Sequence, residues 1–396
     1  MNVRKTLLLT ALAIIPLFAA AQEKPHSQRV QNICGPYIQN VTQTGFTVMW
    51  LSDVDAVAWV EVAPSDGTHF YNRERPKYYD LSGCGVKPVN KIHKVTVDGL
   101  TPGTTYRYRI MMKAIDRYYS TWDIVYGRVY GAEVYQAKLP EIKTLDPDCR
   151  RVNFSVVNDI HAKDSVLRRL FADKKQIRAQ DFVLFNGDMT SDISYEEKIV
   201  KHYLSPACEL FADGTPLYMV RGNHEFRGKD AIKLLDYFDF PCRRPYYTFR
   251  YGKFFFIVLD SGEDKPDSDI EYQDVLCTDP YLRQEAEWLK QVVSSTDFRQ
   301  AERRIVFSHI PPKLNAWHGQ TNLSTLFLPI LNEAGIDVMF SGHEHAYSFD
   351  KVGTSDAKFP VVVNDDCERM DVTVDAKKIS MKMYDPDGKL THSVVL

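Results

Sequence analysis

Side chains that commonly bind metal ions occur in five short phrases between residues 159 and 345. Each phrase directly follows a short apolar run that is typical of a β-strand. The phrases contain carboxylate, imidazole and amide groups but no thiolate, a mixture that suits iron, manganese or zinc better than magnesium or calcium. In chain order they are Asp159-Ile160-His161, Gly187-Asp188, Gly222-Asn223-His224-Glu225, His309 and Gly342-His343-Glu344-His345.

These phrases hold more candidate ligands than a single metal ion needs. A carboxylate can bridge two cations, and Asp188 is the central candidate for that role. Two ions about 3.5–4 Å apart can activate a water molecule, neutralise phosphoryl oxygens and stabilise a leaving oxygen. The neutral imidazole and amide groups limit the negative charge around a site that must accept an anion. The pattern therefore predicts a two-metal centre for phosphate esters.

Strands alternating with helices from residue 150 onward would position these phrases. Because ligands bind where the carboxyl ends of strands converge in open α/β folds, we expect one shared site. The strands expected before the phrases are 152–157, 182–185, 217–220, 305–307 and 338–340. The longer helices are expected at 164–177, 195–211, 281–293 and 326–334. After residue 361 we expect strands only.

The chain before residue 146 has a different pattern, in which short alternating strands and turns follow one another without helices. This pattern predicts a β-sandwich, interrupted by a polar insertion at 66–90 and followed by a linker at 138–150. The phrase Leu100-Thr-Pro-Gly-Thr-Thr-Tyr106 resembles the late strands of a fibronectin type III domain. In such domains the tyrosine hydroxyl hydrogen-bonds back to the backbone.

The first residues resemble a secretory signal peptide. Arg4 and Lys5 precede an apolar run that ends in Ala19-Ala20-Ala21, and this run is shorter than the ~20 residues of a membrane-spanning helix. We therefore expect cleavage of residues 1–21. No later stretch is apolar and long enough to cross a bilayer. The expected location is the periplasm or the extracellular space.

Composition narrows the class of protein further. The 396 residues include 44% hydrophobic and 26% charged side chains, which excludes a disordered chain. With 49 basic against 52 acidic residues, nothing points to nucleic acid as a partner. The seven cysteines are an odd number, so at least one thiol is unpaired within the chain. Cys34 and Cys84 are a candidate disulfide, and buried free thiols are the alternative.

Together, the five phrases resemble those of the calcineurin-like metallophosphoesterases over roughly residues 150–350. The phrase Gly342-His-Glu-His-Ala-Tyr347 and the preceding fibronectin-like region are similar to the purple acid phosphatases and their bacterial relatives. The resemblance implies an α+β fold class. An all-β sandwich over 28–146 would be followed by a four-layer αββα metallophosphoesterase domain over 150–396.

The resemblance also implies roles for individual residues. One metal would be bound by Asp159, His161, Asp188 and His345. The other would be bound by Asp188, Asn223, His309 and His343. His224 would bind no metal, but would contact the phosphate and act as general acid for the leaving group.

One departure from the purple acid phosphatase pattern concerns a metal-bound tyrosine. That family has it three residues after the bridging aspartate, where this chain has Ser191. The family also has glycine where this chain has His161, so we expect His161 to replace the missing ligand. The visible colour of an iron–phenolate centre should then be absent, and an acidic pH optimum is not implied.

The predicted activity is hydrolysis of small-molecule phosphate monoesters by an exported two-metal enzyme containing iron, manganese or zinc. Arg227 and His318 are further candidates for contact with substrate, each with a purely structural alternative. Within the enzyme class, a phosphodiester or a nucleotide pyrophosphate is the alternative substrate. A secreted binding protein with a silent phosphoesterase domain is the alternative outside it. The sequence predicts no oligomeric state.

Overall fold

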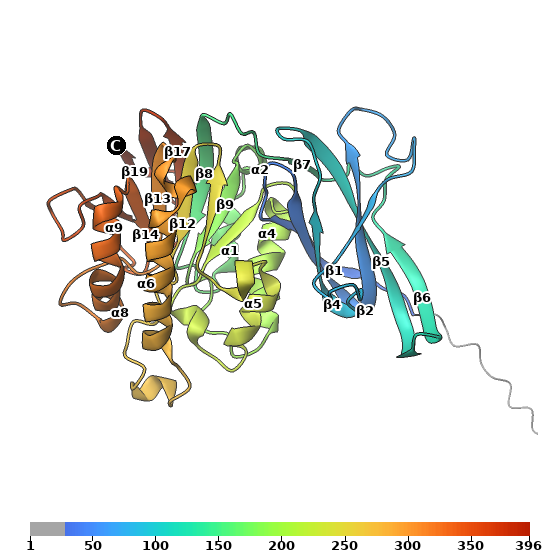
Figure 1. Cartoon of the computed structure of the whole chain (residues 1–396), viewed down its shortest axis with the longest axis horizontal. Helices are drawn as coiled ribbons and strands as arrows, with labels where there is room; N and C mark the ends of the chain where they lie inside the picture. The colour runs from blue at the N-terminus through green and yellow to red at the C-terminus, as the bar shows by residue number, and fades with distance from the viewer. Residues whose placement is uncertain (1–27) are drawn as a thin grey trace, which may run out of the picture.

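The computed structural model describes residues 28–396 in two regions that lie side by side (Figure 1). The first region is a β-sandwich, and the second is an α/β region with helices on both sides of two sheets. The signal peptide predicted at 1–21 lies outside the described residues. Within them, no helix is long and apolar enough to cross a membrane.

The sandwich is organised around one long strand that contributes to two pairings. The first half of β2 pairs with β1 and β4, and its second half pairs with β3 and β5. The expected linker at 138–150 is partly wrong, because β7 within it pairs with β5. The strands are β1 (Asn32–Gln39), β2 (Phe46–Pro64), β3 (Lys77–Tyr79), β4 (Asn90–Val97), β5 (Thr105–Ser120), β6 (Asp123–Gly131) and β7 (Glu141–Lys143).

The two faces of β2 are both buried, but against different partners. Phe46, Val48 and Trp50 point into the core of the sandwich. Met49 and Leu51, on the opposite face, belong to the core of the second region. Side chains alternate between the faces of a strand, so this single segment joins the two cores.

The tyrosine corner expected from the sequence is present. The backbone N–H of Thr101 donates to the hydroxyl of Tyr106 at 3.0 Å. This bond fixes the turn that leads into β5.

The second region contains two six-stranded mixed sheets. The first has the order β10-β9-β8-β17-β18-β19, and the second β11-β12-β13-β14-β16-β15. The strands of the first sheet are β8 (Arg151–Val157), β9 (Phe182–Asn186), β10 (Leu217–Val220), β17 (Arg369–Asp375), β18 (Ile379–Tyr384) and β19 (Leu390–Val395). Those of the second are β11 (Tyr247–Tyr251), β12 (Phe254–Val258), β13 (Arg303–Phe307), β14 (Val338–Ser341), β15 (Ser348–Asp350) and β16 (Val361–Val363).

Phenylalanine rings fill the space between the two sheets. Phe154 of β8 stacks on Phe182 of β9 with ring centroids 4.6 Å apart. The same ring meets Phe256 and Phe307 of the second sheet edge-on at 5.8 and 5.7 Å. Such ring pairs stabilise beyond the apolar area that they bury, and they hold the two sheets in fixed register beneath the site.

Helices cover the outer faces of both sheets (Figure 1). The helix expected at 164–177 is interrupted, because Asp173 caps a new helix with its side chain. The segment expected at 195–211 is helical but contains a π-helical turn at Val200–Leu204. The α-helices are α1 (Asp164–Leu170), α2 (Lys174–Arg178), α3 (Glu197–Ile199), α4 (Ser205–Leu210), α5 (Leu234–Tyr237), α6 (Thr278–Ser294), α7 (Thr296–Arg299), α8 (His318–Asn322) and α9 (Leu328–Ala334).

Hydrogen bonds join the sandwich to the second region. Ile38 N–H donates to the Ala212 carbonyl at 2.8 Å, and the Tyr37 hydroxyl donates to the Tyr237 carbonyl at 2.9 Å. Asp239 accepts from Thr47 Oγ1 at 2.9 Å and forms an ion pair with Lys94 at 3.2 Å. The two regions therefore meet through a polar and apolar interface.

The cysteine pairing considered from the sequence is wrong. Cys34 is buried, whereas Cys84 is exposed, and both are free thiols. The neighbour of the Cys34 sulfur is the Cys208 sulfur of α4, 3.8 Å away across the interface between the regions. Proximity of the two residues in the sequence did not indicate proximity in space.

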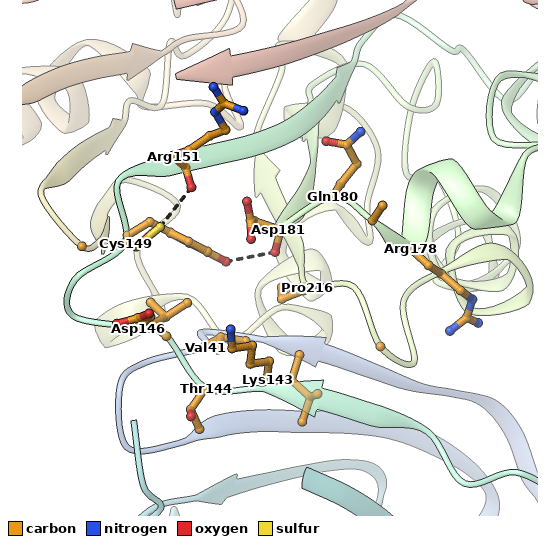
Figure 2. A pocket seen from close by; sticks show the side chains of 16 residues that line it. Val41, Lys143, Thr144, Asp146, Cys149, Arg151, Arg178, Gln180, Asp181 and Pro216 are labelled. Atoms are coloured by element: carbon orange, nitrogen blue, oxygen red, sulfur yellow. Dashed lines mark hydrogen bonds between the residues drawn. The ribbon is translucent and has the colours of Figure 1, made fainter. Parts of the chain in front are cut away.

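A cavity of about 390 Å³ also lies between the regions (Figure 2). Lys143 of β7 lines one side of it, and Arg178, Asp181 and Cys149 line the other. None of its lining residues is a histidine. The five metal-binding phrases therefore lie elsewhere in the fold.

Candidate metal centre

The five phrases come together where the carboxyl ends of strands from both sheets meet. The loop after β8 carries Asp159 and His161, and the loop after β9 carries Asp188. The loop after β10 carries Asn223 and His224. The second sheet supplies His309 after β13, and His343 and His345 after β14. Three overlapping groups of potential ligand atoms result: Asp159, His161 and His345; His161, Asp188 and His224; and Asp188, His309 and His343.

The backbone of these loops is bent in an uncommon way. Asp159, His161, Asp188, His343 and His345 all have positive φ, between 47° and 71°. This left-handed conformation costs free energy for residues other than glycine, and it clusters at functional sites in folded proteins. Here it occurs in the loops that follow β8, β9 and β14, three of the five strands that lead to the site.

Glycines allow the loops to approach each other closely. A Cβ atom on Gly222 would lie 2.3 Å from Asp188 Oδ1, and one on Gly342 would lie 2.7 Å from Asp159 Oδ2. Neither position has room for a larger residue. The glycines of the sequence phrases therefore have a packing role beside the ligands.

The first group of ligands surrounds one buried carboxylate oxygen. Asp159 Oδ1 lies 3.2 Å from His345 Nε2 and 3.8 Å from His161 Nε2. The two imidazole nitrogens are themselves 3.2 Å apart. Asp159 Oδ1 is buried, and no hydrogen-bond donor is aligned with it. An unsatisfied buried oxygen facing two imidazole nitrogens fits a cation better than an empty space.

The second group is more deeply buried and centres on Asp188. His309 Nε2 lies 3.1 Å from Asp188 Oδ2, and both side chains are at most 2% exposed. With its amide oxygen turned inward, Asn223 places that oxygen 3.1 Å from His343 Nδ1 and 3.2 Å from His309 Nε2. Four potential metal-ligand atoms thus face one another. A cation between them would stabilise this arrangement.

Hydrogen bonds from outside the cluster fix the orientation of the ligands. His309 Nδ1 donates to the Asn186 carbonyl at 2.7 Å, which leaves Nε2 as the ligand atom. The Asn158 amide donates to Asp159 Oδ2 at 2.7 Å. The backbone N–H of His343 donates to the same oxygen at 2.9 Å.

Glu225 is a positioning residue that sequence reasoning missed, although it ends the phrase that begins at Gly222. It is fully buried, and its carboxylate accepts the backbone N–H groups of Asp188 and Gly222, each at 2.8 Å. It also accepts the N–H of Met189 and the hydroxyl of Tyr203. Burial raises the pKa of Glu225. One carboxylate thus ties the loops after β9 and β10 together.

His224 lies at the rim of the cluster. Its Nδ1 is 2.7 Å from the Ser191 carbonyl, and its Nε2 is 3.7 Å from Asp188 Oδ2. Its ring also stands edge-on to the His161 ring at 4.9 Å. Ser191, which occupies the position of the absent tyrosine, therefore contributes its backbone oxygen. His224 can face a bound substrate, and it is also close enough to Asp188 to act as a ligand.

The titration of the histidines reflects the surrounding charges. Burial opposes a charge on His309, but the Asp188 and Asp159 carboxylates raise its pKa to about 10. Burial and the neighbouring charge of His309 lower the pKa of His343 to about 4. In the metal-free protein His309 thus carries the proton that balances the carboxylates. Metal binding must displace this proton.

Arg227 lies beside the cluster but is already paired. Its Nε is 2.7 Å from Glu263 Oε1, and Nη2 is 3.1 Å from Asp264 Oδ1. Its Nη1 lies 3.4 Å from both ring nitrogens of His224. Arg227 is therefore close enough to meet a substrate, while three carboxylates, with Glu271 as the third at 3.5 Å, hold its guanidinium.

His318 is not brought into the cluster. Its Nε2 lies 2.7 Å from Asp279 Oδ1, near the start of α6, and 3.0 Å from the Asn322 amide. These contacts fit a structural role at the start of α8. A substrate contact by His318 remains a prediction.

Comparison with known proteins defines the class. Residues 152–347 match the calcineurin-like phosphoesterase family, and residues 35–125 match the purple acid phosphatase N-terminal domain. The chain therefore carries a calcineurin-like metallophosphoesterase domain behind a purple acid phosphatase N-terminal domain. The family resemblance and the fold class predicted from the sequence are confirmed.

The individual proteins that this chain resembles have low sequence identity to it. The yellow lupin purple acid phosphatase PPD1 shares the fold, with a TM-score of 0.64 and 16% identity over 91% of this chain and 73% of that one. Purple acid phosphatase 21 of Arabidopsis thaliana is 22% identical over 84% of this chain and 69% of its own length. The mouse serine/threonine-protein phosphatase CPPED1 is 30% identical over 33% of this chain. That match spans 41% of the mouse protein.

Proposed function

We propose that the chain is an exported two-metal phosphoesterase that hydrolyses phosphate monoesters. The observation that carries the proposal is the position of Asp188. Its carboxylate belongs to one group of potential ligand atoms with His309 and His343, and to another with His161 and His224. A carboxylate that belongs to both groups supports a bridging role for Asp188 between two metal ions.

Two cations bound there would supply Lewis acidity and an activated water molecule. The side chains of the chain itself hold and orient the reactants. Asp188 would hold the two metal positions close together. The Asn186 carbonyl keeps the Nε2 lone pair of His309 directed at the cluster.

His224 would hold a proton for the leaving oxygen. Its Nδ1 donates to the Ser191 carbonyl at 2.7 Å, which fixes the orientation of the ring. Nε2 then points to the side of the cluster where a phosphate oxygen would lie. The backbone N–H of His224 donates to Asp188 Oδ1 at 3.0 Å. This bond fixes the position of His224, the proposed acid, relative to Asp188, the proposed bridging ligand.

Metal analysis and two model substrates test the proposal. Purified protein should contain at least one metal ion per chain, and it should release p-nitrophenol faster from the monoester than from the bis-ester. Iron, manganese and zinc are each supplied in separate assays. Faster cleavage of the bis-ester would instead support a phosphodiesterase. Less than one ion per chain together with no hydrolysis would contradict the proposal.

Two variants separate metal binding from proton transfer. Asn223→Ala should abolish turnover, because it removes a proposed metal ligand. His224→Ala should slow turnover and keep the metal content of the wild type. Loss of metal from His224→Ala would instead identify His224 as a ligand.

Export and the identity of the metals are tested separately. Mature protein purified from its native host should begin at Gln22 and occur outside the cytoplasm. Since Ser191 replaces the metal-bound tyrosine, the iron-loaded protein should lack a phenolate band in its visible spectrum. A strong visible band would contradict the proposed replacement of that ligand by His161.

A further inference from the structure

A pocket of about 850 Å³ lies next to the candidate metal centre. Two loops form most of it: the loop after β10 supplies Phe226, Arg227 and Ile232, and a loop before α6 supplies Tyr272 and Val275. The first of these loops is the one that carries Asn223 and His224. The pocket is therefore built in part by the segment that carries two residues of the candidate centre.

The rim and part of the wall of this pocket are apolar. Ile232 and Val275 at its rim are 64% and 79% exposed. Phe226 and Tyr272 provide aromatic surface in its wall. A contiguous apolar surface left open to water typically marks a place where a ligand binds.

Two lining residues connect the pocket directly to His224. The Ser191 carbonyl accepts the Nδ1 hydrogen of His224 at 2.7 Å. Arg227 lies 3.4 Å from the same ring. The pocket therefore borders the ring that is proposed to protonate the leaving oxygen.

The arginines of the pocket are already neutralised by carboxylates. Arg227 is paired with Glu263 and Asp264, as described above. Arg221 is paired with Asp260, and its guanidinium lies 3.6 Å from the centre of the Phe226 ring. Neither arginine is therefore available to bind a second phosphate. Lys229 is a third cation of the lining, but it is exposed to solvent, so the apolar wall of the pocket suits an uncharged group.

We propose that this pocket holds the leaving group of the ester, and that the preferred substrate is a phosphate of a bulky apolar alcohol. This inference rests on the proposed phosphoesterase function. Apolar contact with Ile232, Val275 and Phe226 would favour such esters, because each apolar group removed from water contributes to binding.

Two esters isolate this contact. Ethyl phosphate and 2-phenylethyl phosphate both release a primary alkanol, so any difference between them mainly reports contact with the phenyl ring. For the metal-loaded wild type, kcat/KM should be at least ~10-fold higher for the phenylethyl ester, since one methylene in an apolar pocket already gives about that much discrimination. Equal values for the two esters would overturn the inference.

Variants at the rim locate the contact. Val275→Asp and Ile232→Asp change exposed side chains, so the fold should tolerate them, and each should lower the preference for the phenylethyl ester several-fold. Val86→Asp is the matched control, because Val86 is an exposed valine (65%) in a loop of the sandwich and should change neither rate.

The outcomes distinguish this inference from the function on which it rests. Unchanged preference in both rim variants would overturn the role of the pocket while leaving the phosphoesterase intact. Failure of the metal-loaded wild type to hydrolyse any ester, p-nitrophenyl phosphate included, would overturn the proposed function itself and this inference with it.

Discussion

His93 in the sandwich and His309 in the phosphoesterase domain are both almost completely buried, at 3% and 0% exposure. Their pKa values nevertheless move in opposite directions. Burial lowers the pKa of His93 to about 4. Burial acts on His309 in the same sense, but the Asp188 and Asp159 carboxylates outweigh it and raise the pKa to about 10. The neighbouring charged groups determine the direction of the pKa shift, because burial alone favours the neutral form of a histidine.

The two environments show how differently the regions bury polar groups. His93 bonds one hydroxyl, that of Ser52 at 2.8 Å, and its ring lies against Trp50. His309 is one member of a network of charged and neutral ligands. Isolated polar pairs of the first kind stabilise a fold. A buried network with unsatisfied electron pairs lowers the stability of the fold unless a bound ligand satisfies them. Such networks are therefore expected at sites of binding or catalysis.

Replacing the two histidines should give the largest contrast. His309→Gln should lower kcat/KM well beyond the ~100-fold typical of losing an outer partner of a metal ligand, because a proposed ligand itself is lost. His93→Gln should leave kcat/KM of the folded protein unchanged. Steady-state kinetics and metal content per chain measure both effects. Wild-type metal content in His309→Gln would show that this residue is not a ligand.

The two buried glutamates offer a second matched pair. Glu225 accepts hydrogen bonds from the loops of the site and from Tyr203, whereas Glu61 accepts them from Trp59 and Tyr71 within the sandwich. Glu225→Gln should reduce kcat/KM by about 10–100-fold, since the amide cannot accept all of those bonds. Glu61→Gln should not affect it. Equal losses in the two variants would mean that Glu225 acts only through stability.

The position of the site could be predicted from the sequence because two signals coincide there. Each apolar run marks a buried strand, and each metal-binding phrase follows one directly. Parallel strands such as β8 and β9 end at the same edge of their sheet, so convergence follows from topology alone. The strands of the sandwich and its tyrosine corner could also be predicted, because both depend on residues that are close together in the sequence.

Contacts between distant segments could not be predicted in this way. The pairing of Arg227 with Glu263, and the position of Cys34 beside Cys208, depend on how loops and regions pack. The left-handed backbone at His343 and His345 also gives no sequence signal, because residues other than glycine adopt it only under tertiary constraint. The periodicity of 164–177 predicts one helix, but α1 ends at Leu170 and the side chain of Asp173 caps the start of a second helix.

The two histidines also predict opposite pH dependence of stability in the metal-free protein. The folded state lowers the pKa of His93 from 6.5 to about 4, so the unfolded chain binds more protons between these values and stability falls as the pH falls through this window. Between about pH 7.5 and about pH 5 the loss should be about 2 kcal/mol. The contribution of His309 has the reverse sign: it is present below pH 6.5 and is lost as the pH rises toward 10.

Urea unfolding of wild type and His93→Gln at several pH values measures this effect. The difference in the free energy of unfolding between the two proteins should shrink on acidification, because the variant has no histidine to protonate. A difference that stays constant with pH would mean that His93 is not held neutral by burial.

The smallest predicted effect concerns the interface that joins the two regions. The buried Tyr37 hydroxyl donates to the Tyr237 carbonyl at 2.9 Å, and Tyr37→Phe should lower the free energy of unfolding by about 1 kcal/mol. Tyr106→Phe, which removes a bond within the sandwich, is the matched variant. If the regions unfold together, both variants should shift the loss of activity and the change in tryptophan fluorescence by equal amounts. If Tyr106→Phe shifted fluorescence but not activity, the sandwich would unfold separately, and its hydrogen bonds to the loop after α4 and to α5 would not couple the two regions.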